Sequence, residues 1–441
     1  MKRERQKNLL FELADLLEKN HIVFWLEFGT LLGAVRDKNF IGNDWKDIDL
    51  GLDYKDYWKV KNLLEKNGWK FKHIWLRELA VYKREEELPL HIDLFFVEKD
   101  RKNMYRYLYR PDYKRNGEWV KEWRCVSPLE YHFPLKKINF LGRKFNIPNQ
   151  REKYLELHYG NWKEPKEEYT TYENSPDRDS SYDITNRVTA IVPVFLRKQC
   201  LFNLITSIRK FYPKLKIIVG YQGDFGEKIK DDLVEIIFLP FDCGLSYSRN
   251  ELVKKVDTEY TLLLDDDFVF IEETILEKLL DVFAYEKDIG IVGGRLKDKS
   301  YEKFFIFAGE ILSSIYFEEL REKGFLEYRK INNLNFGFAD IIYNFFIAKT
   351  KVLKKYKWDN RHLIWSEHLD FFLNLKLNSK VKVAFVPEVI VEHKPLLDSK
   401  FKKFRNRMFY DLIYKKFGYK IGHTIGENAV LNYEKNRREK L

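Results

Sequence analysis

Residues 1–162 alternate between short apolar runs and segments with helical periodicity. The apolar runs predict strands at HIVFWLEFG, KDIDLGL, LAVYK (79–83) and LHIDLFFVE (90–98). A helix is predicted over 54–67. Five leucines at helical spacing predict an amphipathic helix over 4–19: Leu9, Leu10, Leu13, Leu16 and Leu17. This alternation predicts an α/β domain with a small mixed sheet.

Residues 163–186 are polar and almost free of aliphatic side chains, which predicts an interdomain linker. Beyond them, continuous apolar runs alternate with helical segments: VTAIVPVF, KIIVGY, VEIIFL, YTLLLDDD and IGIVGG. Strands that are apolar throughout are buried on both faces, so residues 187–399 are predicted to form a doubly wound, mostly parallel sheet. Residues 400–441 are predicted to form a helical tail.

Composition narrows the class of protein. A length of 441 residues suits two or three domains. The cysteines are odd in number and widely spaced, with no disulfide framework or zinc pattern, so a reducing compartment is expected. The charged N-terminus lacks a signal-peptide core, and no apolar run reaches the roughly 18 residues of a membrane span. These features predict a cytoplasmic protein.

The net charge of +11 is concentrated in the tail, where residues 400–441 hold 12 Lys and Arg against 4 Asp and Glu. Aromatic side chains are interleaved with these charges: Phe401, Phe404, Phe409, Tyr410, Tyr414 and Phe417. This mixture suits peripheral contact with the anionic inner face of the cell membrane. The alternative is a solvated helical tail that packs on its own domain. Nucleic acid is not expected as a partner, because no recognition motif accompanies the charge.

Two Asp-x-Asp pairs carry the candidate chemistry. Asp47 and Asp49 form the first pair, and Asp265 and Asp267 form the second. Side chains at i and i+2 of a strand share a face, so each pair directs two carboxylates at one place. Such carboxylates suit a Mg²⁺ or Mn²⁺ ion that bridges the phosphates of a nucleotide donor. Two pairs therefore predict two nucleotide-dependent transferase sites.

A third carboxylate, Asp93, lies on the apolar strand LHIDLFF, where an acidic residue is unexpected unless it is paired or binds metal. It is predicted to complete a triad with Asp47 and Asp49. The small turn at Gly29 and Thr30 would let backbone N–H groups approach a phosphate. The alternative is that the first pair is a surface strand end and that Asp93 is satisfied by Lys or Arg.

Residues 22–98 resemble the family of LicD-type bacterial phosphocholine transferases and animal fukutin-related ribitol-phosphate transferases, through FGTLLGAVRDKNFI, DID and HIDLFF. The resemblance implies a nucleotidyltransferase-like fold that transfers a phospho-alcohol from a CDP-linked donor to a sugar. Its implied catalytic and metal-binding residues are Asp47, Asp49 and Asp93. Its implied phosphate-binding residues are Gly29, Thr30 and Arg36. The sequence NDWKDID interrupts the family's acidic run, which leaves the role of Asp44 and the alcohol open.

Residues 188–395 resemble GT-A glycosyltransferases of family 2, and more closely the β-1,4-N-acetylgalactosaminyltransferases. The segments that carry this resemblance are TAIVPVFLR, DCGLSYSRNELVKKVDTEYTLLLDDDFVF, IWSEHLDFFL and PEVIVEHKP. It implies a metal-dependent inverting enzyme that uses a UDP-sugar, either a UDP-HexNAc or a UDP-hexose. Its implied metal ligands are Asp265, Asp267 and His393. Its implied nucleotide-binding residues are Pro193, Arg197, Asp242, Arg249, Asn250, Asp265 and Asp266.

An inverting mechanism needs a general base close to the acceptor hydroxyl. Glu367 and Asp370 lie three residues apart at the start of a predicted helix, so both could project from one side of its first turn. Glu367 is the preferred base and Asp370 the second candidate. His368 stands where many relatives carry aspartate. The alternative reading of His393 is a structural histidine bonded to a neighbouring carboxylate.

Three functions are compatible with these motifs. The first is a bifunctional enzyme of surface-polysaccharide synthesis, such as capsule or teichoic acid, that adds a sugar and a choline, ribitol or glycerol phosphate to a glycan or lipid-linked glycan. The second is a glycosyltransferase whose N-terminal domain is a non-catalytic carbohydrate-binding or scaffold module. The third is a nucleotidyltransferase acting on nucleic acid or a small drug, which FGTLLGAVR disfavours.

Overall fold

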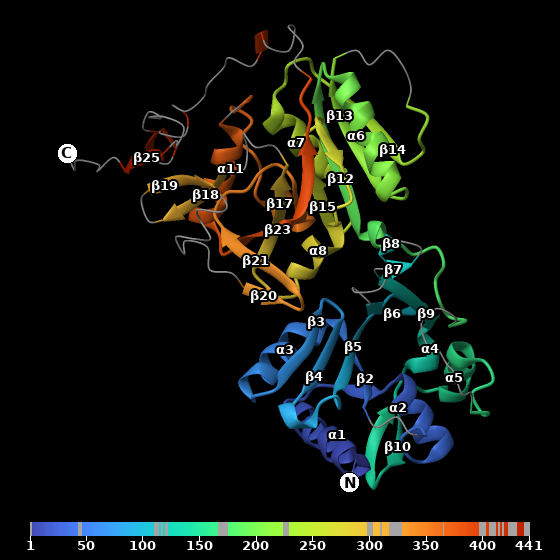
Figure 1. Ribbon diagram of the computed structural model, residues 1–441. Helices are drawn as coiled ribbons and strands as arrows, with labels where there is room; N and C mark the ends of the chain where they lie inside the picture. The colour runs from blue at the N-terminus through green and yellow to red at the C-terminus, as the bar shows by residue number, and fades with distance from the viewer. Residues whose placement is uncertain are drawn as a thin grey trace. The chain divides into compact units, whose positions relative to one another are not determined.

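The structure is a computed structural model in which the chain divides into two compact units, Met1–Asp183 and Ile184–Leu441 (Figure 1). It describes residues 2–42, 46–109, 114–115, 118–119, 122–165, 175–223, 229–297, 303–308, 311–316, 329–364, 366–396, 403–404, 412, 415–416, 419–421 and 430–435. Among these residues, no helix has both the length and the apolar character needed to cross a bilayer. Most of the predicted helical tail lies outside the described residues, and two of its described stretches, Tyr419–Ile421 and Val430–Lys435, are strands where a helix was predicted.

The N-terminal unit is built on a mixed sheet. Its strands in spatial order are β1 (Phe24–Leu26), β2 (Asp49–Asp53), β5 (Ile92–Lys99), β4 (Glu78–Tyr82) and β3 (Lys70–Trp75), with β6 (Asn103–Tyr109) pairing with β5 and with β9 (Glu122–Pro128). Strands β2 and β5 are parallel, and the other pairs are antiparallel. Two hairpins complete the strands: β7 (Lys114–Arg115) with β8 (Glu118–Trp119), and β10 (Lys136–Phe140) with β11 (Arg143–Ile147).

Helices cover this sheet because their apolar stripes match its apolar face. The first, α1 (Lys2–Lys19), buries Leu9, Leu10, Leu13 and Leu17 in the same core as strand residues Leu50 and Leu94. The other helical segments are α2 (Phe28–Leu32), η1 (Gly33–Asp37), η2 (Tyr54–Asp56), α3 (Tyr57–Lys66), η3 (Glu85–Glu87), α4 (Leu129–His132) and α5 (Arg151–Tyr159). The α/β class predicted for this part of the chain is confirmed.

A buried polar network ties the end of the predicted linker to the N-terminal unit. Arg106 is fully buried, and its guanidinium donates to Glu27 Oε1 at 3.0 Å and to Asp177 Oδ2 at 3.0 Å. Asp177 also accepts from the Val126 backbone through its carbonyl (2.9 Å), and its carboxylate lies 2.8 Å from His158 Nδ1. Residues 175–183 are thus packed in the first unit, whereas the sequence predicted a linker over 163–186. Polar composition did not reveal this packing, because the polar side chains are paired with a buried arginine.

Loss of the Asp177 charge is expected to lower the free energy of unfolding of the N-terminal unit by about 3 kcal/mol, because it leaves part of a buried arginine uncompensated. The measurement is urea-induced unfolding of Asp177→Asn, followed by amide exchange in β2 and β5. The control is Asp179→Asn, which removes a partly exposed partner of Arg124 and should cost under about 1 kcal/mol. Equal losses in the two variants would contradict the prediction.

The stability of the N-terminal unit is also expected to depend on pH through Asp177. Burial alone would raise the pKa of Asp177, but His158 and Arg106 lower it to about 2. A carboxyl whose pKa is lower in the folded state stabilises the fold at pH values above its ordinary pKa. This stabilisation should therefore be lost as pH falls from about 4 toward 2.

The C-terminal unit is built on a larger mixed sheet. Its spatial order is β14 (Val234–Leu239), β13 (Lys216–Gln222), β12 (Val188–Phe195), β15 (Tyr260–Leu263), β22 (Phe346–Lys349), β17 (Ile289–Leu296), β23 (Lys382–His393), β21 (Leu334–Ala339) and β20 (Arg329–Ile331). Strand β16 (Phe268–Phe270) pairs with β23, and a separate sheet contains β18 (Lys303–Ala308), β19 (Ile311–Tyr316), β25 (Val430–Lys435) and β24 (Tyr419–Ile421).

Strands β14, β13, β12 and β15 run parallel, whereas β22 is antiparallel to both of its neighbours. The predicted α/β class is confirmed, and the structure adds that the sheet is mixed. An apolar strand reports burial on both faces, not direction, so the sequence pattern could not reveal the reversal at β22. The helical segments whose bounds are described are η4 (Ile184–Arg187), α6 (Lys198–Phe211), α7 (Leu245–Lys254), α8 (Leu276–Val282), α10 (Thr350–Lys355) and α11 (Glu367–Asn378).

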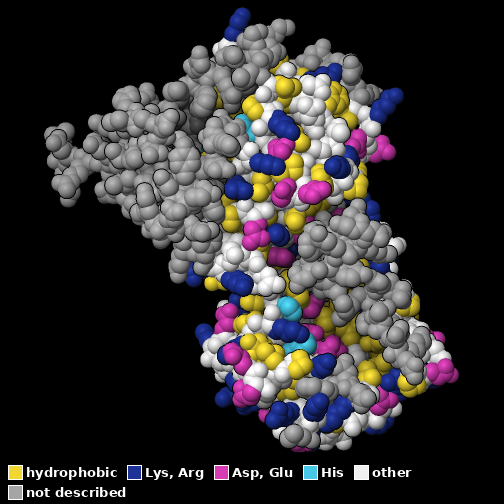
Figure 2. Space-filling view, in the orientation of Figure 1, with side chains coloured by type: hydrophobic (Ala, Val, Ile, Leu, Met, Phe, Trp, Pro, Cys, Tyr) yellow, Lys and Arg dark blue, Asp and Glu magenta, His cyan; other side chains and the backbone are white. Residues whose placement is uncertain are grey.

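The described surface carries charges of both signs. On the face shown in Figure 2, Lys and Arg side chains are interspersed with Asp, Glu and hydrophobic side chains over each unit. This mixture is typical of a solvated protein surface.

Candidate active sites

Three carboxylates meet at one end of the N-terminal sheet. Asp49 is the first residue of β2, and in the parallel pairing of β2 with β5 its register partner is Asp93. Register partners on adjacent strands point to the same face, and Asp47 precedes Asp49 by two residues. Ligand atoms of Asp47, Asp93 and His91 all lie within 4.8 Å of one another. Asp49 is not one of this group, but it lies close enough for the charges of Asp47 and Asp93 to act on its carboxylate, and the metal-binding triad stays a prediction.

The convergence of these carboxylates has an electrostatic cost. Burial raises the pKa of Asp49 well above its ordinary value, and the neighbouring charges of Asp47 and Asp93 raise it further. Ionisation of all three neighbouring carboxyl groups is unfavourable unless a cation compensates their charges. Oxygen ligands of this kind fit a hard divalent ion such as Mg²⁺.

Gly29 and Thr30 contact the carboxylate of Asp49. The Thr30 backbone N–H donates to Asp49 Oδ2 at 3.2 Å, and the Asp49 N–H donates to Thr30 Oγ1 at 2.8 Å. A Cβ atom on Gly29 would lie 3.1 Å from Asp49 Oδ2, so a larger residue there would crowd the carboxylate. The two hydrogen bonds of Thr30 orient Asp49, and the predicted phosphate-binding role of Gly29 and Thr30 stays a prediction. Arg36 donates to Asp37 at 2.7 Å and to the Trp162 carbonyl at 3.2 Å, and its phosphate-binding role stays a prediction.

His91 is a candidate that the sequence reasoning did not select. Its Nε2 atom lies 3.5 Å from Asp93 Oδ2 and 3.9 Å from Asp47 Oδ1. Its Nδ1 atom lies 2.8 Å from the Pro89 carbonyl oxygen, a contact that favours the tautomer with the proton on Nδ1 and leaves Nε2 to face the carboxylates. The available signal was the spacing HID, since residues two apart on a strand share a face.

The second site is a cavity of about 250 Å³ in the C-terminal unit. It lies where β12 and β15 end, and the carboxyl ends of parallel strands in an open α/β sheet are the usual place for a ligand crevice. Most of the residues predicted for this site line the cavity: Pro193, Arg197, Asp242, Asp265, Asp266, Asp267, Glu367 and His393. These side chains come from segments separated by up to two hundred positions in the printed sequence.

Asp267 is held between two cationic or polar partners. The Arg197 Nη1 atom donates to Asp267 Oδ2 at 2.6 Å, and His393 Nε2 lies 3.4 Å from the same oxygen. Burial alone would raise the pKa of Asp267, but His393 and Arg197 lower it. By contrast, burial raises the pKa of Asp266, which is 1% exposed and also paired with Arg197. The contact between His393 and Asp267 matches the alternative reading of His393 as a histidine bonded to a neighbouring carboxylate, and the metal-binding role of both residues stays a prediction.

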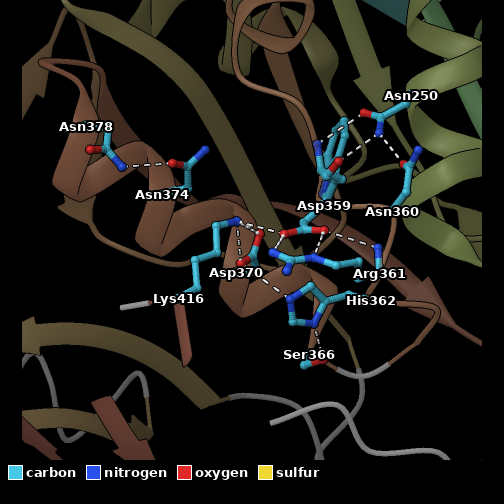
Figure 3. A network of polar contacts seen from close by, with 11 residues as sticks. Asn250, Asp359, Asn360, Arg361, His362, Ser366, Asp370, Asn374, Asn378 and Lys416 are labelled. Atoms are coloured by element: carbon cyan, nitrogen blue, oxygen red, sulfur yellow. Dashed lines mark hydrogen bonds and ion pairs between the residues drawn. The ribbon is translucent and has the colours of Figure 1, made fainter. Parts of the chain in front are cut away.

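Arg249 and Asn250 lie behind the cavity wall, whereas the sequence predicted that they contact the nucleotide. The buried guanidinium of Arg249 donates to Glu367 Oε1 at 3.2 Å and to Asp265 Oδ1 at 3.5 Å. The Asn250 side chain donates to the Trp358 carbonyl at 2.8 Å and to Asn360 Oδ1 at 2.7 Å (Figure 3). Both side chains are buried within α7, so they support the wall without lining it.

The two candidate bases are separated by the structure. Glu367 lines the cavity, whereas Asp370 is fully buried one turn further along α11 and pairs with Lys416. Asp370 therefore differs from its prediction as a second base, because its carboxylate faces away from the cavity lining. His368 lines the cavity, and burial together with Arg249 lowers its pKa to about 3, so its ring is neutral at neutral pH.

Two family models match this chain. Residues 21–150 match the LicD/FKTN/FKRP nucleotidyltransferase domain, and residues 189–357 match glycosyl transferase family 2. The beta-1,4 N-acetylgalactosaminyltransferase 1 of Rattus norvegicus is 35% identical over 223 residues, which are 50% of this chain and 41% of that protein. The ribitol-5-phosphate transferase FKTN of Homo sapiens is 29% identical over 171 residues, which are 37% of this chain and 34% of that protein.

The chain thus spans less than half of the length of either relative. A solved structure of GalNAc-T7 with UDP, GalNAc and Mn²⁺ is 14% identical, with a TM-score of 0.38 over 49% of this chain and 45% of that chain.

Proposed function

We propose that this chain, in which a LicD-type nucleotidyltransferase domain precedes a family 2 glycosyltransferase domain, is a transferase with two active sites that act on one glycan. The C-terminal site would add a hexosamine or hexose from a UDP-sugar. The N-terminal site would add choline, ribitol or glycerol phosphate from a CDP-linked donor. The acceptor would be a glycan or a lipid-linked glycan of surface-polysaccharide synthesis.

The observation that carries the proposal is that each unit gathers several carboxylates at one sheet end. At the N-terminal site, Asp47, Asp49 and Asp93 would hold a divalent ion, and Thr30 would keep Asp49 in place through the two bonds described above. A bound Mg²⁺ or Mn²⁺ would supply positive charge to the donor diphosphate. The protein side chains would then orient the acceptor hydroxyl toward the phosphorus atom of the donor.

At the C-terminal site, Glu367 is proposed to accept the proton of the acceptor hydroxyl. The oxygen would form a bond to the anomeric carbon as the bond from that carbon to the nucleotide phosphate breaks, with inversion and release of UDP. Arg249 holds one oxygen of Glu367 and leaves the second for the acceptor. Asp267 and His393 would hold the divalent ion at the diphosphate.

A second candidate function is a glycosyltransferase with a non-catalytic N-terminal scaffold. The observation that favours it is the engagement of two predicted phosphate-binding residues elsewhere, with Arg36 on Asp37 and Thr30 on Asp49. It predicts that substitution of Asp47 and Asp49 leaves every turnover unchanged.

Thermal stabilisation by nucleotides separates the two functions. The measurement adds CDP or UDP, each with Mn²⁺, to the wild-type chain, to Asp47→Ala with Asp49→Ala, and to Asp265→Ala with Asp267→Ala. A nucleotide at 100 times its dissociation constant should stabilise its unit by about 2.7 kcal/mol. Loss of only the CDP effect in the first variant and only the UDP effect in the second supports two sites. Stabilisation by UDP alone supports the scaffold function.

A further inference from the structure

Lys416, in the basic C-terminal segment (residues 400–441), contacts the first turn of α11. The Lys416 ammonium lies 2.8 Å from each carboxylate oxygen of Asp370 and 3.2 Å from Asp359 Oδ2 (Figure 3). Asp370 is fully buried, whereas the Lys416 side chain is 26% exposed. Removal of the cation from a buried carboxylate leaves an uncompensated buried charge, so this contact contributes more than a surface ion pair would.

The contact belongs to a network around the first turn of α11. His362 Nε2 lies 3.4 Å from Asp370 Oδ1, and His362 Nδ1 lies 2.6 Å from Ser366 Oγ. The Asp370 backbone N–H donates to the Ser366 carbonyl at 2.9 Å. Ser366 directly precedes Glu367, the proposed base. The network therefore joins Asp370 and His362 to Ser366, the backbone neighbour of Glu367.

The cluster has the spacing of a cation site, and the chain supplies the cation itself. Ligand atoms of Asp359, His362 and Asp370 lie within 4.8 Å of one another. Arg361 donates to Asp359 at 2.9 Å through Nε, which leaves the Asp370 carboxylate facing Lys416 and His362. Lys416 forms an ion pair with both aspartates, and Arg361 pairs with Asp359 and adds positive charge near Asp370.

A second residue of the same segment contacts the cavity directly. Phe404 lines it, with its ring centroid 5.1 Å from that of Phe195 and 5.7 Å from that of Phe241. Phe195 ends β12 and also lines the cavity. The C-terminal segment thus contacts both the strand side and the α11 side of the candidate glycosyltransferase site.

We propose that Lys416 is a positioning residue for sugar transfer, which holds Asp370 and thereby fixes the first turn of α11 so that Glu367 faces the acceptor hydroxyl. This inference rests on the proposed glycosyltransferase function of the cavity. It assigns to the basic C-terminal segment a role inside its own domain. A displacement of the base by about 1 Å can lower a rate by about 10²-fold, so a distant lysine can control catalysis.

The test compares Lys416→Met, which keeps length and loses charge, with Lys415→Met at the neighbouring exposed lysine. Lys416→Met is expected to lower kcat for sugar transfer by about 10- to 100-fold, with the KM for the UDP-sugar within about 2-fold. Lys416→Arg should retain most of the rate. Adding Asp370→Asn to Lys416→Met should recover part of the rate, since it removes the uncompensated buried charge. An unchanged kcat in Lys416→Met, or equal losses in the two methionine variants, would overturn the proposal.

Amide exchange at residues 366–372 gives a readout that does not need turnover. Lys416→Met should accelerate exchange in this turn while UDP with Mn²⁺ still stabilises the unit. Exchange at the same rate in Lys416→Met and in the wild-type chain would overturn the inference. If the wild-type chain transfers no sugar, the proposed function fails. The exchange result then still decides whether Lys416 holds the turn.

Discussion

The Asp267→Asn variant is expected to transfer sugar about 10²- to 10³-fold more slowly than the wild-type chain, while its turnover of a CDP-linked donor stays unchanged. The carboxylate of Asp267 is buried beside Arg197 and His393 in the cavity of the C-terminal unit. Asparagine keeps the shape and removes the charge that would hold a divalent ion at the donor diphosphate. The measurement is release of UDP and labelled sugar transfer at saturating donor.

The matched control is Asp231→Asn in the same unit. Asp231 is also paired with an arginine, Arg209 at 2.6 Å, but it does not line the cavity. Its sugar-transfer rate should stay within about 2-fold of wild type, since this part-buried pair lies outside the cavity lining. If Asp267→Asn kept its sugar-transfer rate while UDP with Mn²⁺ still bound, the assignment of this aspartate to the metal would be wrong.

The second large effect is expected in the N-terminal unit. Asp49→Asn should lower phospho-alcohol transfer from a CDP-linked donor by about 10²- to 10³-fold and leave sugar transfer unchanged. Asp49 faces Asp93 across the β2 and β5 pairing, so its charge contributes to the proposed metal site. The thermal midpoint of this unit is expected to stay or to rise, because burial and the neighbouring carboxylates disfavour the ionised form of Asp49, and asparagine is neutral with the same shape.

Asp53→Asn is the control for this variant. Asp53 lies on the same strand, four residues on, and pairs with Lys99 at 2.8 Å away from the triad. Its phospho-alcohol transfer should match wild type. Loss of both activities in Asp49→Asn, with the fold intact, would show that the two sites are coupled and would contradict independent sites.

Much of the site could be predicted from short-range patterns. The Asp-x-Asp pairs are contiguous in sequence, and residues two apart on a strand share a face wherever the strand lies. The helix over 4–19 could be predicted for the same reason, since its leucines mark one stripe and the structure places that helix at Lys2–Lys19. The role of Asp93 needed one more step, namely that an acidic residue on an apolar strand requires a partner.

Other features depend on packing that no local pattern reports. Arg249 follows a glycine-and-serine turn, which suggested a donor contact, yet its guanidinium is buried between Asp265 and Glu367. Asp370 and Glu367 share the start of one helix, but their side chains point to different places. Asp370 contacts Lys416, whereas Glu367 lines the cavity. The polar composition of 175–183 is typical of a linker. Its pairing with Arg106 could not be predicted, because Arg106 lies on a strand far away in the sequence.

By itself, the sequence determined the α/β class of both units, the strand-end aspartates and the resemblance to two transferase families. These depend on periodicity and on contiguous motifs, which a single chain displays directly. Only the tertiary structure decided that β22 runs antiparallel to its neighbours, that His91 lies beside Asp47, that Glu367 and not Asp370 lines the cavity, and that Lys416 holds Asp370. Each of these is a contact or strand order between distant segments, and it is set by how their side chains fill a common core, not by the residues on either side of them.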